Sequence, residues 1–225
     1  MNEFAVVSEG ATDYAVLKNI LVGWFKDQSA EPFLKPYQPD PTADGVSSWQ
    51  QFGTWENVIR YLQGKKHRDA LEFAEYLIVQ IDTDQSEHVN FGVPQREDDR
   101  QLDPHTMVER VVAKLREIIG TEDLTFYEDR IIFAICVREV ECWLLPLWDE
   151  SRADKSTGCL KAIDLALRKA DEHILSTEPK DARLYDQASK EYRKRKVLLA
   201  KGPLNPSLAI FLDELERRHI TLSDG

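Results

Sequence analysis

The feature that most constrains the fold of this chain is a set of short apolar segments that end abruptly at acidic residues. Residues 4–8, 76–81 and 130–137 are rich in Val, Ile and Phe, which is typical of buried strands. Stretches whose apolar residues recur at helical spacing lie between them. Alternation of strands and helices is characteristic of a largely parallel sheet with helices on both faces. The sequence therefore predicts an α/β fold.

The remaining elements follow from capping residues, spacing and turn-forming residues. Thr12 or Asp13 is predicted to cap a helix extending to Phe25, and an irregular strand is predicted over residues 31–38. Further helices are predicted over residues 54–62, up to Ala74, over 108–119 and over 139–147, with exposed loops over 39–53 and 85–104. After about residue 150 only helices are predicted, over 160–170, 185–199 and 206–218. We therefore expect an α/β domain at residues 1–150 and an all-helical extension at residues 151–225.

Acidic side chains follow each of the strongly apolar segments. Glu9 follows the first, Asp82 and Asp84 follow the second, and Glu139 and Glu141 follow the third. Because the carboxyl ends of parallel strands meet at one edge of a sheet, we expect these carboxylates to lie close together. A hard cation such as Mg²⁺ prefers oxygen ligands, and carboxylates packed together need a cation to offset their repulsion. The sequence therefore predicts that Glu9, Asp82 and Asp84 bind a divalent metal, Mg²⁺ or Mn²⁺.

Each of these acidic residues also has a purely structural interpretation. An aspartate after a strand is common as a turn former or helix cap, and Asp13 is expected to be such a cap. Glutamates at the start of a helix interact favourably with the helix dipole, which would account for Glu139 and Glu141. Residues two apart on a helix face different ways, so only one of this pair is expected to point into a metal site.

Composition narrows the choice of partners. The 225 residues carry a formal net charge of −11, which argues against a general electrostatic grip on nucleic acid but leaves room for a local basic patch. The densest basic stretch holds Lys190, Lys194 and Lys196, which are candidates for phosphate contacts or for a solvated helix face. No apolar run reaches the roughly 20 residues of a membrane span, and the N-terminus enters a strand pattern without a basic leader. We therefore expect no membrane association.

The cysteines and the absence of a nucleotide loop give two further expectations. Cys136, Cys142 and Cys159 show neither a zinc-type spacing nor an even disulfide framework, so a reducing cytoplasm is the expected compartment. No Walker-type loop occurs, so an ATPase that drives this protein would be a separate chain.

Two of the acidic motifs resemble those of a known family. The segment Val6–Asp13, which reads VVSEGATD and precedes an amphipathic helix, resembles the first motif of Toprim domains. The apolar strand ending in Asp82-Thr83-Asp84 resembles their second motif. The segment Arg138–Leu145 is similar to one in the small Toprim nucleases of the overcoming-lysogenisation-defect type, found in prokaryotic defence systems. The resemblance covers about residues 3–148.

The resemblance implies a Toprim-like fold and a role for each acidic residue. Glu9 would be a metal ligand and an acid or base, and Asp82 and Asp84 would be metal ligands. Glu141 is preferred to Glu139, because the resemblance places the functional glutamate just before Trp143; it would complete a second metal site. Toprim domains use these groups to break or join phosphodiester bonds.

Three functions are therefore expected in this order. The first is a Mg²⁺-dependent nuclease with Glu9, Asp82, Asp84 and Glu141 as catalytic residues, which the resemblance would make the effector of a phage-defence system. The second is a catalytically weak regulatory or effector subunit that binds a partner ATPase. The third is nucleotidyl transfer of the kind primases perform, which the missing zinc module and nucleotide loop make less favoured. A homo-oligomer is compatible with all three.

Overall fold

The fold is organised around one parallel sheet. The computed structural model describes residues 3–38 and 54–222, and it contains β1 (Glu3–Val7), β2 (Phe33–Gln38), β3 (Tyr76–Asp82) and β6 (Ile131–Cys136). These four strands pair in the order β2-β1-β3-β6, and every pairing is parallel. The α/β class and the parallel sheet predicted from the sequence are confirmed.

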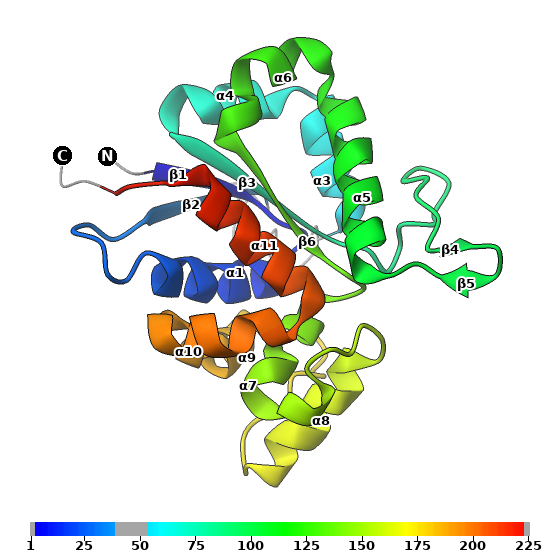
Figure 1. Ribbon diagram of the computed structural model, residues 1–225, viewed down its shortest axis with the longest axis vertical. Helices are drawn as coiled ribbons and strands as arrows, with labels where there is room; N and C mark the ends of the chain where they lie inside the picture. Colours follow the sequence, from blue (N-terminus) through cyan, green and yellow to red (C-terminus); the bar gives the residue numbers. More distant parts are fainter. Residues whose placement is uncertain (1–2, 39–53, 223–225) are drawn as a thin grey trace.

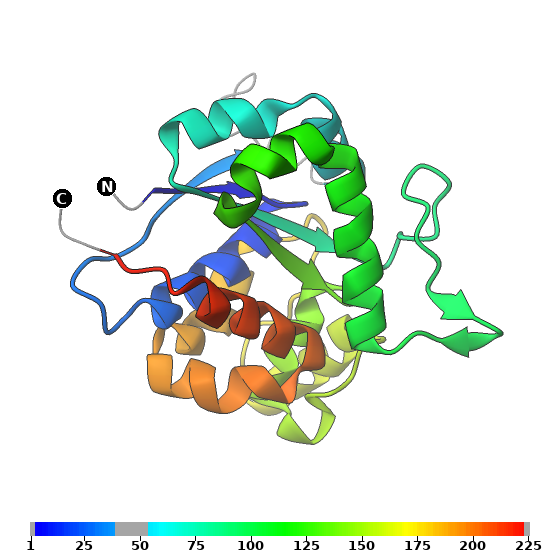
Figure 2. The same cartoon turned by 45° about the horizontal axis from the view of Figure 1, so that its top comes forward.

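Four helices cover one face of the sheet. They are α3 (Trp55–Gln63), α4 (Lys66–Phe73), α5 (Pro104–Ile119) and α6 (Thr121–Tyr127), and they lie above the sheet in Figures 1 and 2. Successive side chains of a strand point to opposite faces, so this face receives the odd-numbered residues of the first and third strands. The residues that pack against these helices include Ala5, Val7, Leu77, Val79 and Ile81.

On the opposite side, α1 (Ala11–Trp24) and α11 (Pro206–Arg218) lie next to the sheet. The helices α8 (Cys159–Lys169), α9 (Ala182–Ser189) and α10 (Arg195–Lys201) lie farther from it, beyond α1 (Figure 1). One core cluster joins them to the sheet through residues that include Phe4, Val6, Ile78, Ile132, Tyr185, Tyr192 and Phe211. Residues on both sides of the predicted boundary at residue 150 contribute to this core.

A close approach of backbones fixes α1 against the C-terminal third. The helix lies beside α9 and the 3₁₀ helix η4 (Lys190–Arg193). A Cβ atom at Gly23 would lie 1.8 Å from the carbonyl oxygen of Tyr192. Because backbone atoms cannot move aside as a flexible side chain does, only glycine fits at this contact.

Several element boundaries differ from the sequence predictions. Helix α1 begins at Ala11 with Gly10 as its N-cap, so the prediction that Thr12 or Asp13 caps it was wrong. The segment predicted as a helix over 139–147 begins as the 3₁₀ helix η2 (Val140–Leu144) and continues as the short α7 (Leu145–Trp148). The helix predicted over 185–199 is divided into α9, η4 and α10.

The two predicted loops have different outcomes. Residues 85–104 contain a short antiparallel hairpin of β4 (Arg96–Glu97) and β5 (Arg100–Gln101), which projects from the body beside the start of α5 (Figure 1). The loop predicted over residues 39–53 lies outside the described residues. Within the described ranges, no helix has the combination of length and apolar character needed to cross a bilayer.

Candidate metal centre

The acidic residues gather where the strand order of the sheet reverses direction. The chain passes from β1 to β2 on one side and from β3 to β6 on the other, so β1 and β3 flank the switch point. Ligands of open α/β sheets bind beyond the carboxyl ends of the strands at such a point. Glu9 follows β1, and Asp82 is the last residue of β3. The backbone N–H of Asp82 donates a 2.8 Å hydrogen bond to Oε1 of Glu9, so these two residues are brought together as predicted.

Gln80 connects the acidic groups of the two strands. This side chain is fully buried on β3, two residues before Asp82, and points to the α1 face of the sheet. Its amide nitrogen donates to Oδ1 of Asp82 at 2.9 Å and to Oδ1 of Asp13 at 3.2 Å. Its amide oxygen accepts the N–H of Glu9 at 3.1 Å. Sequence reasoning missed Gln80, although a glutamine within the otherwise apolar YLIVQI run was a visible signal.

Asp13 belongs to this cluster and does not cap α1. Its carboxylate is 6% exposed and accepts a 3.0 Å hydrogen bond from the hydroxyl of Thr12 in addition to that from Gln80. Burial, followed by the negative charge of Glu141, raises the pKa of Asp13 to about 6. The sequence prediction of a cap was wrong because the partner of Asp13 lies 67 residues away in the chain.

Glu141 supplies a fully buried carboxylate from η2. Its Oε1 accepts a 2.8 Å hydrogen bond from Nζ of Lys180 and a short one from the hydroxyl of Tyr185. Its Oε2 is buried and has no hydrogen-bond partner among the described residues. A buried carboxylate oxygen without a partner is costly, so this atom is available to a ligand.

Glu139 has a different task from Glu141. Its Oε1 accepts the backbone N–H groups of Cys159 at 2.7 Å and Leu160 at 3.0 Å, the first two residues of α8. These donors have no partner within the helix, so the carboxylate holds the start of α8 against η2. Burial raises the pKa of Glu139. The structure thus distinguishes the two glutamates, which the sequence alone did not: Glu139 holds the start of α8, and Glu141 belongs to the acidic cluster.

The carboxylates of the cluster oppose one another's ionisation. Burial, followed by the charge of Asp13, raises the pKa of Glu9 well above its usual value. The same two effects, together with Glu9, raise the pKa of Asp82 well above its usual value. Burial would lower the pKa of Lys180, but the charge and hydrogen bond of Glu141 outweigh it and raise that pKa. One lysine thus faces several carboxylates, and burial together with their mutual repulsion raises the pKa values of Glu9, Asp13 and Asp82.

Asp84 lies at the exposed rim of the cluster. Its backbone N–H, like that of Thr83, donates to the carbonyl of Arg138, at 3.0 Å for Asp84. Arg138 has a φ of +75°, a value that few residues other than glycine adopt, and its own N–H donates to the hydroxyl of Thr83 at 2.8 Å. These bonds tie the turn after β3 to the turn after β6, and they place Asp84 at the entrance to the cluster.

Two of the cysteines form a disulfide, which the sequence did not predict. Sγ of Cys142 on η2 is bonded to Sγ of Cys159 at the start of α8. Their donor atoms lie within 4.8 Å of the Glu139 carboxylate, a spacing that would suit a metal, but sulfurs bonded to each other are not thiolate ligands. Cys136 is free and buried. The sequence indicated no disulfide framework because three cysteines form no even set, whereas the structure pairs two of them.

The basic stretch that holds Lys190, Lys194 and Lys196, a candidate for phosphate contacts or for a solvated helix face, lies away from the acidic cluster. Arg193 pairs with Asp186 at 2.8 Å, and Arg195 pairs with Asp27 just beyond the C-terminal end of α1. Asp13 and Glu9 lie at the opposite end of that helix. The basic residue that reaches the cluster is Lys180, which precedes α9 and was not singled out by sequence reasoning.

Comparisons with known proteins identify no relative. No family model, no curated protein and no solved structure matches this chain. What can be inferred about the site therefore depends on the residues and the geometry described above.

Proposed function

We propose that this protein is a metal-dependent phosphodiesterase of the Toprim type that cleaves nucleic acid. The observation that carries the proposal is the convergence of three distant segments at one edge of the sheet. Residues 6–13, 82–84 and 138–145, which resemble segments of Toprim nucleases, contribute Glu9, Asp82 and Glu141 to one cluster. Convergence of this kind is what a Toprim-like site requires, and the hydrogen bonds that join the three segments support the proposal.

Carboxylate oxygens are the ligands that Mg²⁺ and Mn²⁺ prefer. Glu9, Asp82, Asp84 and Glu141 would hold the ion, and the buried Oε2 of Glu141, which has no hydrogen-bond partner among the described residues, is a donor atom for it. A divalent cation bound there supplies positive charge that polarises a phosphoryl oxygen and lowers the pKa of a water.

The other residues of the cluster have roles that follow from their contacts. Burial raises the pKa of Glu9, which lies just beyond the end of β1, so this carboxyl would be the group that accepts and returns a proton. Lys180 keeps 47% of its side chain exposed while it pairs with Glu141, so its ammonium can face the negative charge that develops on a phosphate. Gln80 touches Glu9, Asp13 and Asp82 and positions them relative to one another.

A cleavage assay tests the proposal. The purified protein is incubated with plasmid, single-stranded DNA and RNA in Mg²⁺, in Mn²⁺ and in EDTA. We expect cleavage that needs a divalent cation and that is lost in Asp82→Asn and Asp84→Asn. Asp213→Asn, which removes one exposed carboxylate on α11, serves as the matched control and should cleave normally. Absence of cleavage by the wild type, or full cleavage by the Asp82→Asn, Asp84→Asn double variant, would refute the proposal.

The second candidate function is that of a regulatory or effector subunit bound to a separate ATPase. The β4–β5 hairpin favours it, because all four strand residues are exposed and the hairpin projects from the body (Figure 1). Co-purification of an ATPase with the protein, combined with a cellular effect that survives loss of Asp82 and Asp84, would support this candidate against the nuclease.

A further inference from the structure

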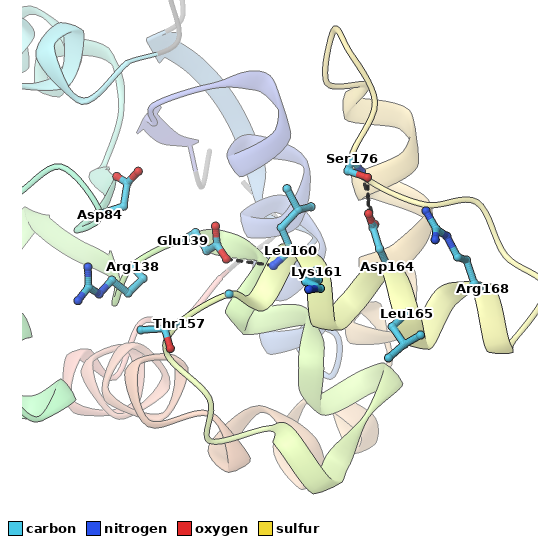
Figure 3. A pocket seen from close by; sticks show the side chains of 11 residues that line it. Asp84, Arg138, Glu139, Thr157, Leu160, Lys161, Asp164, Leu165, Arg168 and Ser176 are labelled. Carbon is cyan, nitrogen blue, oxygen red and sulfur yellow. Dashed lines mark hydrogen bonds between the residues drawn. The ribbon is translucent and has the colours of Figure 1, made fainter.

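A pocket of about 670 Å³ opens beside the acidic cluster. Asp84, Arg138 and Glu139 line one end, and residues of α8 and of the segments that flank it line the rest, as Figure 3 shows. This volume lies within the range of sites that enclose most of a small ligand. Because Asp84 belongs to both, the pocket leads directly to the candidate metal centre.

Two of the three acidic residues that line the pocket accept hydrogen bonds from other parts of the protein. Glu139 accepts two backbone N–H groups at the start of α8. Asp164 is buried and accepts the N–H of Leu175 at 2.7 Å and the hydroxyl of Ser176. Asp164 thereby ties the segment that leads to Lys180 onto α8, and Figure 3 shows the contact between Asp164 and Ser176.

The basic residues of α8, in contrast, are free. Lys161 and Arg168 are exposed, and within the part of the chain that the structure describes neither side chain has a hydrogen bond or ion pair. They are seven residues apart, which places them on one face of the helix at a separation of about 10 Å along its axis. Leu165, which is 44% exposed, lies between them on the same face.

We propose that this pocket binds a single strand of nucleic acid and delivers it to the metal centre. Lys161 and Arg168 contact phosphates of different nucleotides, and Leu160 and Leu165 form an apolar wall for an unstacked base. The inference rests on the proposed nuclease function and adds the substrate class. Paired cationic and apolar contacts along a groove are how proteins hold single strands. A duplex keeps its bases stacked inside, so it cannot place a base against the leucines.

The net charge of −11 argues against binding along the surface of a duplex. A protein that grips duplex along its surface needs many phosphate contacts, whereas this chain offers a few cations in a concave site. Each phosphate contact to a single strand contributes about 0.7 to the slope of log K against log salt concentration. Loss of the Lys161 and Arg168 cations should therefore make that slope shallower, reducing its magnitude by about 1.4.

Binding is measured by fluorescence anisotropy of a short labelled strand with the full chain, in EDTA and again in Ca²⁺. We expect Lys161→Ala, Arg168→Ala to weaken binding about tenfold or more and to lower the salt slope. The control Lys169→Ala, Lys196→Ala removes the same charge from exposed positions outside the pocket and should bind as the wild type does. A duplex of equal length and the mononucleotide should both bind more weakly than the strand.

The apolar wall has its own test. Leu165→Ala should weaken binding of a strand that carries bases and should leave binding of an abasic strand unchanged, because the leucine contacts the base alone. If Leu165→Ala weakens the binding of both strands equally, the proposed contact between Leu165 and a base is refuted.

The outcomes separate this inference from the proposed function. The pocket inference is refuted if the Lys161, Arg168 variant binds like the wild type, if its control loses as much affinity, if duplex or the free nucleotide binds best, or if no strand binds. If strands bind through the pocket but no metal-dependent cleavage occurs, the binding site stands and the nuclease function fails. If cleavage occurs without any effect of the pocket variant, the nuclease function stands and the pocket inference fails.

Discussion

Replacing Asp13 by Asn should stabilise the metal-free protein above neutral pH. Asp13 is buried among carboxylates, and its pKa is raised from 3.8 to about 6. At a pH between these values the folded state holds a proton that the unfolded state has lost. The free energy of unfolding therefore falls as the pH rises through this window, and the loss is complete above about pH 6.

The magnitude follows from the difference between the two pKa values. About two pKa units correspond to about 3 kcal/mol of destabilisation by the ionised carboxylate. Asparagine removes the charge, and its carbonyl oxygen can still accept the hydrogen bond that Gln80 donates to Asp13. The amide must adapt to the hydroxyl of Thr12, which reduces the gain, so we expect a net stabilisation of about 1 to 3 kcal/mol.

Urea unfolding in EDTA is measured from about pH 4 to pH 8, a range that covers the window between the two pKa values of Asp13. The wild type should lose stability across this range, and Asp13→Asn should lose less and be the more stable protein at pH 8. Glu9 and Asp82 also have raised pKa values, so some pH dependence should persist in the variant. The exposed Asp213→Asn should follow the wild type. Identical pH profiles for wild type and Asp13→Asn would refute the account of the buried charge.

Three further perturbations test other parts of the structure. Lys180→Met should lower the rate of strand cleavage about 10²-fold or more with little change in KM, because it removes a charge that acts mainly in the transition state. Single-turnover kinetics would show an unchanged cleavage rate if Lys180 is only structural. Gly23→Ala should destabilise the fold by about 3 kcal/mol, since its Cβ would meet the Tyr192 carbonyl at 1.8 Å; a denaturation midpoint equal to that of the wild type would contradict this contact. Reduction of the Cys142–Cys159 disulfide opens a loop with a sequence separation of 17 residues and should cost about 3 kcal/mol; calorimetry of the wild type with and without a reductant would find no difference if the thiols do not pair.

The sequence predicted the strands and their acidic ends because both signals are local. A run such as residues 76–81 is too short and too apolar for an exposed helix, and the carboxylate after it marks the sheet edge. The parallel order then brings Glu9 and Asp82 together although they are 73 residues apart. In these residues local pattern and global fold agree, which is why the prediction succeeded.

The parts of the site that were not predicted depend on contacts that local rules cannot detect. Asp13 has the position of a helix cap, but its partner Gln80 comes from another strand. Lys180 lies in a segment without a regular pattern, and Asp164 and Ser176 anchor that segment to α8. The disulfide of Cys142 requires η2 to meet the start of α8, a packing contact that cysteine spacing alone does not reveal.

The central claim is that Glu9, Asp82 and Glu141 hold a divalent cation at the switch point of the sheet. Anomalous diffraction from crystals soaked in Mn²⁺ tests it most directly, because the ion is located without reference to any activity. We predict an anomalous peak between these carboxylates, within about 2 to 2.5 Å of at least two of their oxygens, and no such peak in Asp82→Asn crystals. A saturating soak that leaves this position empty, or that places the ion elsewhere, would contradict the account.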